Sequence, residues 1–200
     1  RSKHLDIGCG WGTLLRYASK QYDTVSTGLC FQKTQQDWHQ TKCKDEGIKT
    51  AQVLCFDMEY GFALPKVGAD ALFDCVTCLE FSDYCGPIGC DKFLQQVQTC
   101  LKPKGVLHIQ VTSLRRTWSF EDILWHQFVA EHIIPFCPSR PRWSPHPVAH
   151  LPLSFVIVKL ENAGFAIQQI ECNGANLRQT LDAWTTNWLA NRASVIKSTN

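Results

Sequence analysis

The sequence predicts an α/β protein built on a doubly wound, mostly parallel sheet. Two observations support this prediction. Strand-like and helix-like runs alternate regularly along the 200 residues. The first strand-like run also leads through a Gly-x-Gly-x-Gly turn directly into a helix-like run. A strand, a glycine turn and a helix in this order are typical of a nucleotide-cofactor platform.

Strands and helices alternate through the first half of the chain. We expect strands at residues 3–7, 24–29, 51–56, 73–79 and 106–111. We expect helices between them at residues 13–21, 34–46 and 90–101. Gly47 is a good stop for the second helix, and the segment Lys102-Pro103-Lys104-Gly105 closes the third.

The order changes after the fifth strand. Residues 118–134 form an amphipathic helical stretch, and residues 136–152 carry five prolines. Together, residues 118–152 predict a helical and Pro-rich, lid-like insertion. A helix at 154–163, a sixth strand at 165–171 and a last helix at 176–191 complete the chain. The length fits one domain over residues 1–200.

Composition limits the functional classes. With 44% hydrophobic and 19% charged residues the chain is globular. The net charge of +2 argues neither for nor against nucleic acid. No Lys/Arg block stands out, and we predict no nucleic-acid partner. No apolar run approaches the roughly 18 residues that a membrane span needs. The first strand begins almost at Arg1, and we therefore expect the chain to be a fragment.

The chain has eleven cysteines and no secretory segment, which predicts free thiols in a reducing, intracellular compartment. Cys75 and Cys78 have a metal-like spacing, but they lie in a predicted strand. Strand residues three apart face opposite sides of the sheet, so these two cannot share a metal without distortion. The sequence predicts no metal site.

The glycine turn is the best candidate for a binding site. Gly8, Gly10 and Gly12 follow Asp6, which gives the spacing D-x-G-x-G-x-G. The dinucleotide fingerprint is G-x-G-x-x-G, so the third glycine comes one residue too early for it. The spacing resembles that of S-adenosylmethionine-dependent methyltransferases, in which the carboxylate helps to organise the loop around the methionine moiety. The alternative is an ordinary strand–helix turn with tight packing.

Further candidates follow the other strands, because ligands of such sheets lie outside the carboxyl ends of the strands. No acid ends the second strand, and Gln35 is the nearest polar group. After the third strand, Asp57 can accept a hydrogen bond from an adenine amino group and Met58 can pack on its ring. After the fourth strand, Glu80 or Asp83 can act as a base or hold a polar group of the substrate. Surface polar residues and helix-capping acids are the alternatives.

The longer pattern resembles the cyclopropane-fatty-acid synthase family, and within it the fungal-type sphingolipid C9-methyltransferases. The residues that carry the resemblance are Leu5–Gly12, Thr27-Gly28, Gln35, Thr77–Glu80, Val106–Gln110, the run Arg115-Arg116-x-Trp118 with Glu121-Asp122-x-x-Trp125, and Leu160–Phe165. The resemblance implies a class I methyltransferase fold and S-adenosylmethionine as cofactor. It also adds Thr27 to the cofactor-binding residues. Methyltransferases of this class usually add a seventh, antiparallel strand, but no candidate for it follows residue 191, and the N-terminal helices of the family are missing.

The resemblance also implies a reaction. An alkene carbon of a lipid takes the methyl group, and loss of a proton then gives a cyclopropane or, in the sphingolipid branch, a methyl-branched alkene. Family members hold a bicarbonate as the base, with a Glu-His pair after strand four, a polar residue on strand five and a Tyr at the start of the last helix. Asp83-Tyr84 stands in place of the Glu-His pair, Gln110 takes the strand-five position, and Asn176-Leu177 replaces His-Tyr. We interpret His108 as a structural residue.

Three functions stay open at this point. The first is C9-methylation of a sphingoid base, with Glu80, Asp83, Tyr84 and Gln110 as catalytic candidates, a lipid substrate and a membrane surface as partners. A segment missing from this chain would then attach the protein to the endoplasmic reticulum. The second is a degenerate, non-catalytic homologue, which Leu177 favours. The third is a small-molecule methyltransferase.

Overall fold

The computed structural model describes residues 1–55, 72–80, 86–113, 124, 127 and 151–199. The chain divides into two compact units, Arg1–Ala166 and Ile167–Asn200. The first unit contains the sheet, and the second contains the long helix α6 (Gly174–Thr199). The single domain over residues 1–200 stays a prediction.

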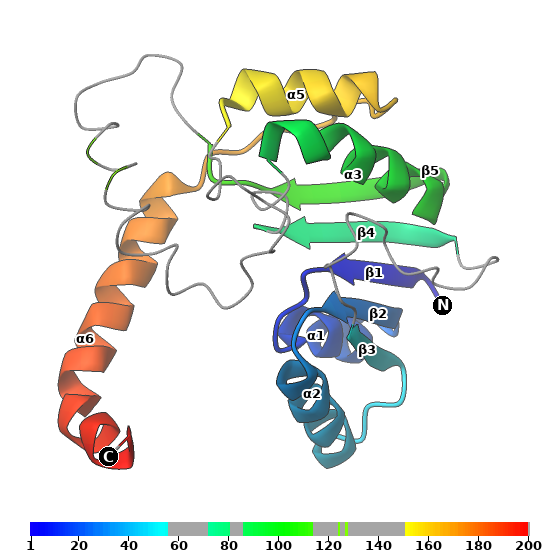
Figure 1. Cartoon of the computed structure of the whole chain (residues 1–200). Helices are drawn as coiled ribbons and strands as arrows, with labels where there is room; N and C mark the ends of the chain where they lie inside the picture. Colours follow the sequence, from blue (N-terminus) through cyan, green and yellow to red (C-terminus); the bar gives the residue numbers. More distant parts are fainter. Residues whose placement is uncertain (56–71, 81–85, 114–123, 125–126, 128–150, 200) are drawn as a thin grey trace. The chain divides into compact units, whose positions relative to one another are not determined.

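Five strands form one parallel sheet in the first unit (Figure 1). They are β1 (Lys3–Ile7), β2 (Val25–Cys30), β3 (Ala51–Cys55), β4 (Phe73–Leu79) and β5 (Leu101–Gln110), in the order β3-β2-β1-β4-β5. The sheet extends from β1 in both directions. Right-handed crossovers therefore place the helices of the two halves on opposite faces. This is the doubly wound α/β fold that the sequence predicts, and its ligand crevice lies where the strand order reverses, outside the carboxyl ends of β1 and β4.

In the described part of the first unit, four helices cover the sheet or each other. They are α1 (Thr13–Tyr22), α2 (Lys33–Asp45), α3 (Gly86–Cys100) and α5 (Leu153–Asn162). Helices α1 and α2 contact β2 and β3, whereas α3 contacts β4, β5 and α5. Gly47 ends α2 with a φ of +67°, and the amide of Ile48 donates to the carbonyl of Cys43 at 2.8 Å. Gly47 therefore closes α2 as the sequence predicts.

The two faces of β1 have different chemistry. Leu5 and Ile7 are fully buried on one face. His4 and Asp6 alternate with them and lie on the other face, together with Gly28, which pairs with Asp6. A side chain at Gly28 would meet Leu15 of α1, so the polar face of β1 is the face that α1 covers. The strand thus carries a buried carboxylate into the glycine turn.

Two predictions about the sheet are wrong. Residues 165–171 form no strand, because an extended segment becomes a strand only where a neighbour accepts its backbone hydrogen bonds, and no described strand pairs with it. The segment Lys102–Gly105, predicted as a turn, belongs to β5. Its turn-like composition is accommodated by a positive φ of +66° at Lys104 and by an irregular register opposite Phe73–Cys75.

Most of the predicted insertion lies outside the described residues. Of its residues the structure describes Leu124 and Gln127, which are both helical, and 151–152. None of the helices in the described ranges is long and apolar enough to cross a membrane. In the same part of the chain, no three His, Cys, Asp or Glu side chains gather in a way that would hold a metal ion.

Candidate active site

The glycine loop closes over the end of β2. The backbone amides of Gly8 and Cys9 both donate to the carbonyl of Leu29, at 3.0 and 2.9 Å. Gly8, Gly10 and Gly12 have φ values of +79°, +53° and +70°, a region that residues with a Cβ rarely adopt. The loop needs glycine at these positions, as the spacing of the motif predicts.

The start of α1 is open to a ligand. Gly12 is the N-cap, it offers no side chain to the free amides of the first turn, and no acid lies in that turn. A Cβ at Gly10 would meet nothing within 4 Å. A positively polarised helix end beside open space is suited to bind a carboxylate or hydroxyl groups of a cofactor.

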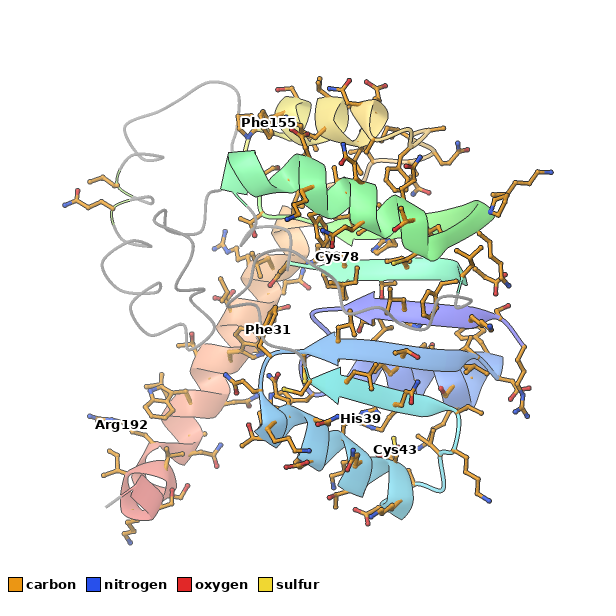
Figure 2. The ribbon with its side chains drawn as sticks, turned by 45° about the vertical axis from the view of Figure 1, so that its right-hand side comes forward. Phe31, His39, Cys43, Cys78, Phe155 and Arg192 are labelled. Carbon is orange, nitrogen blue, oxygen red and sulfur yellow. The ribbon has the colours of Figure 1, made fainter. Side chains whose placement is uncertain are left out.

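Gly12 has the opposite environment. A Cβ there would clash with Nδ1 of His39, which is fully buried on α2 (Figure 2). The His39 Nε2 lies 3.3 Å from Sγ of Cys43, one turn further along the same helix. Burial and the neighbouring Arg16 lower the pKa of His39, so its imidazole is neutral at pH 7. The third glycine of the motif is therefore required because α2 packs directly on the loop.

Arg16 on α1 contacts both the glycine loop and α2. This residue is only 8% exposed, and its Nη1 donates to the backbone carbonyl of Trp11 at 2.9 Å. Its Nε lies 3.4 Å from Oε1 of Glu46, and its guanidinium carbon lies 4.9 Å from the ring centroid of Trp38. The Trp11 and Trp38 rings meet edge to face with centroids 5.5 Å apart. Sequence reasoning missed Arg16, although it lies beside Leu15 on the buried side of α1.

Asp6 lies directly beneath the loop. It is 3% exposed, and Thr77 on β4 donates a hydrogen bond to Asp6 Oδ1 at 2.6 Å. Burial raises the pKa of Asp6 to about 6, although the bond from Thr77 acts in the opposite direction. The Nε2 atom of His4 lies 2.9 Å from the Thr77 hydroxyl oxygen. Neither Thr77 nor His4 was predicted, since their roles depend on strand register.

The other predicted cofactor residues differ in whether the structure places them near the glycine loop. Gln35 lies in the first turn of α2, next to the carboxyl end of β2, and is half-buried. Thr27 lies three residues before the end of β2, is buried and accepts a hydrogen bond from Gln52 Nε2 at 3.1 Å. The structure therefore does not bring Thr27 to the loop. Asp57 and Met58 lie outside the described residues.

Cys30, which ends β2, was not singled out from the sequence. It is buried, and a hydrogen bond from Cys9 lowers the pKa of its thiol to about 7. Its partner Cys9 has a raised pKa for the same reason. The Cys9–Cys30 contact thus links the glycine loop to the end of the second strand.

Two predicted catalytic residues lie together at the carboxyl ends of β4 and β5. Gln110 Nε2 donates to Glu80 Oε1 at 3.0 Å, and the Glu80 amide donates to the Gln110 carbonyl at 2.9 Å. Both side chains are exposed. Glu80 has a φ of +61°, an uncommon value for a residue with a side chain, and such strain often accompanies a functional site. Asp83 and Tyr84 lie outside the described residues.

His108 and Leu177 both lie among the residues that the structure describes. His108 on β5 pairs with Thr77 on β4 and is exposed on the same face as Gln110. Leu177 lies in the first turn of α6 and is 48% exposed. Because α6 belongs to the second unit, its position does not bear on the geometry of the Glu80–Gln110 pair.

Comparison with known proteins agrees with this arrangement. Residues 2–200 match the family described as mycolic acid cyclopropane synthetase. The chain belongs to this family. A sphingolipid C9-methyltransferase of Komagataella phaffii is 36% identical to it over 196 residues, which cover 96% of this chain and 38% of the relative. A cyclopropane-fatty-acyl-phospholipid synthase of Escherichia coli is 25% identical and aligns over 93% of this chain and 42% of its own length.

The solved structures of family members share the fold. The cyclopropane synthase MmaA2 from Mycobacterium tuberculosis superimposes with a TM-score of 0.77 at 22% identity, over 98% of this chain and 66% of that one. The mycolic acid cyclopropane synthase CmaA1, solved in complex with SAH and CTAB, gives the same values. The fold is therefore that of class I S-adenosylmethionine-dependent methyltransferases. The chain spans between a third and two fifths of the length of the sphingolipid C9-methyltransferases it matches.

Proposed function

We propose that the chain binds S-adenosylmethionine at the glycine loop and is the cofactor-binding part of a lipid C-methyltransferase. The observation that carries the proposal is the loop itself: Asp6 beneath it, three glycines with positive φ, and open space above Gly10. The residues present fit the cofactor. The free amides at the start of α1 would bind its polar groups, and Gln35 would lie beside them at the end of β2.

We further propose that the substrate is the alkene of a sphingoid base and that the product is methylated at C9. The names of the relatives that are 36% identical support this choice. When bound, the cofactor supplies a methyl group that is already electrophilic. The protein therefore has to orient the lipid, exclude water and accept the proton that the alkene carbon loses after methyl transfer.

Glu80 is our candidate for the group that handles this proton. Its carboxylate is held by Gln110 at 3.0 Å, at the edge of the sheet where substrates of such folds bind. The Gln110 amide leaves the second carboxylate oxygen of Glu80 available to accept a proton or to hold a bound anion that does so. Asp83 and Tyr84 remain proposed catalytic residues.

The cofactor proposal is tested by calorimetric titration of the chain with S-adenosylmethionine and by one pair of variants. Gly10 and Gly47 both have positive φ and both have open space around a new Cβ. Alanine therefore costs about 1–2 kcal/mol of stability at either position. Only Gly10→Ala places a methyl group over the proposed cofactor loop. We expect Gly10→Ala to lose binding and Gly47→Ala to keep it; equal affinities in the two variants would contradict the proposal.

The lipid proposal is tested with the full-length protein. Radiolabel from the methyl group of S-adenosylmethionine should appear in an unsaturated sphingoid lipid, and Glu80→Gln should reduce the transfer while cofactor affinity stays unchanged. No transfer to any lipid extract would contradict it. Location at the endoplasmic reticulum membrane belongs to the same proposal, and membrane fractionation of the full-length protein tests it.

A second candidate is a homologue that binds the cofactor but transfers no methyl group. The motivating observation is Leu177 at the start of α6, where a leucine cannot hydrogen-bond. Under this alternative, S-adenosylmethionine binds to the chain, and the triple variant Asp83→Glu, Tyr84→His, Leu177→Tyr of the full-length protein gains no activity. A gain of activity in that variant would argue that the scaffold is otherwise competent.

A further inference from the structure

A line of hydrogen-bonding side chains runs through the buried polar face of the sheet to Asp6. Thr77 Oγ1 lies 2.6 Å from Asp6 Oδ1, and His4 Nε2 lies 2.9 Å from Thr77 Oγ1. On the other side of the ring, His4 Nδ1 lies 3.4 Å from Ser26 Oγ, which in turn lies 2.8 Å from Thr24 Oγ1. Strand register places these groups in one row, because His4 pairs with Ser26, and Asp6 pairs with Thr77.

The charge of Asp6 fixes the direction of every bond in this row. An ionised carboxylate can only accept, so Thr77 must give Asp6 its single proton. The Thr77 oxygen can then only accept from His4, which places the imidazole proton on Nε2. The neutral ring therefore has a bare Nδ1, which accepts from Ser26.

Protonation of Asp6 reverses the row. A protonated carboxyl group donates to the Thr77 oxygen, and Thr77 then donates to His4 Nε2. In the imidazole, Nε2 gives its proton to Thr77 Oγ1 as Thr77 gives its own to Asp6, and Nδ1 takes the proton of Ser26, to which it then donates. No partner has to move, and the number of hydrogen bonds is the same in both arrangements. One proton enters the row at Thr24, each group between Thr24 and Asp6 takes one proton and passes one on, and the net gain is a single proton on Asp6.

We propose that His4 and Thr77 are positioning residues that couple the charge of Asp6, beneath the cofactor loop, to the tautomer of a buried histidine. Ionised Asp6 is matched by the Nε2–H form of His4, and protonated Asp6 by the Nδ1–H form. The row thereby keeps the Asp6 carboxyl group hydrogen-bonded in both charge states, so the base of the glycine loop stays fixed when Asp6 titrates.

The surroundings of Asp6 agree with such a coupling. Among the described residues, the titratable groups nearest to Asp6 on this face are His4 on its own strand, Cys9 in the loop and Cys75 on β4, and the Asp6 charge acts on both thiols. His108 on β5 lies on the same face, opposite Thr77. Burial lowers the pKa of His4 and raises the pKa of Asp6 to about 6. Both shifts favour a neutral ring beside a carboxyl group that takes up its proton, which is the combination that a change of tautomer requires.

One consequence rests on the proposed function. S-adenosylmethionine is positively charged, and a cation near the loop is favoured by ionised Asp6. Its affinity should therefore fall as the pH drops through the titration of Asp6. Thr77→Val removes the donor that lowers the pKa of Asp6, so this fall should move to higher pH in that variant.

Nuclear magnetic resonance on the full chain without cofactor tests the proposal itself. Long-range ¹H–¹⁵N spectra report the tautomer of each histidine, and ¹³C carboxyl shifts report the titration of Asp6. His4→Gln and Asp6→Asn assign the signals. We expect His4 to change from the Nε2–H to the Nδ1–H form with the same midpoint as Asp6. In Thr77→Val the tautomer should be independent of pH, while Thr77→Ser, which keeps the hydroxyl, should behave as the wild type.

Three results would overturn the coupling: a His4 tautomer that stays constant through the Asp6 titration in the wild type, a His4 ring that becomes doubly protonated before Asp6, or an unchanged switch in Thr77→Val. The first two need no variant to fold. Calorimetry with S-adenosylmethionine against pH is the separate test of the consequence. A switch seen in the spectra without cofactor binding would contradict the proposed function and leave the coupling in place.

Discussion

Replacement of Asp6 by asparagine should stabilise the folded chain at neutral pH. The folded pKa of Asp6 is about 6, and its ordinary value is 3.8. A raised carboxyl pKa means that folding favours the protonated form. The stability associated with this group is therefore fully present below pH 3.8 and is lost as the pH rises through 6. At 1.36 kcal/mol for each pKa unit, ionised Asp6 costs the folded state about 3 kcal/mol above pH 7.

The assay is urea unfolding of wild type and Asp6→Asn at pH 4 and pH 8, with tryptophan fluorescence as the recorded signal. The asparagine side chain does not ionise, so the free energy of unfolding of the variant relative to wild type should rise by about 2.5 kcal/mol between the two pH values. This is less than the full cost of about 3 kcal/mol, because Asp6 of the unfolded wild type is already partly ionised at pH 4. Comparison across pH cancels any constant loss of packing. A difference that is the same at pH 4 and pH 8 would refute the reasoning.

Asp74→Asn is a control for which we expect stability to change with pH in the opposite direction. Lys102 lies 2.7 Å from Asp74 Oδ1 and lowers the pKa of this exposed carboxyl group. The variant should therefore lose stability relative to wild type at higher pH, by a small amount because the pair is open to solvent. If both aspartates respond in the same direction, then burial is not the cause of the Asp6 effect.

Three other predictions concern residues around the loop and the strand ends. Gly12→Ala should lower the free energy of unfolding, measured by chemical denaturation, by about 2 kcal/mol or more, because it combines a positive φ with a clash against His39. A loss within the roughly 0.5 kcal/mol that is usual for surface substitutions would contradict the packing described. Arg16→Met should lower the free energy of unfolding by about 1–3 kcal/mol and weaken cofactor binding, since the loop carbonyl loses its buried donor. Arg16→Lys should restore the stability only in part. Full restoration would mean that the guanidinium geometry is not required. Glu80→Gly should leave the stability unchanged or raise it by up to about 1 kcal/mol by relieving the positive φ, while methyl transfer by the full-length protein falls; unchanged transfer would remove Glu80 from the catalytic candidates.

Much of the first unit could be predicted from local sequence. The bounds of β1 and β4 agree with the prediction at both ends. In β1, Leu5 and Ile7 alternate with polar residues and Gly8 follows the strand, whereas β4 is a mostly apolar run. The segment 165–171 has the same local signal and yet forms no strand. Strand formation needs a neighbour, and nothing in the local sequence says whether a neighbour is present.

The candidate site, too, could be predicted from the sequence only in part. The glycines and Asp6 were found because a linear spacing encodes the loop. The contact between Glu80 and Gln110 was not predicted, although both residues were, since it depends on the register of β4 and β5. His4 and Thr77 were missed for that reason too. The signal available in the sequence was the alternation of the polar residues His4 and Asp6 with Leu5 and Ile7.

Titration of the chain with S-adenosylmethionine tests the central claim most directly. We expect saturable binding by wild type and Gly47→Ala, and none by Gly10→Ala, at the same folded fraction. Binding that survives equally in all three proteins, or that is absent from wild type, would contradict the claim that the glycine loop holds the cofactor.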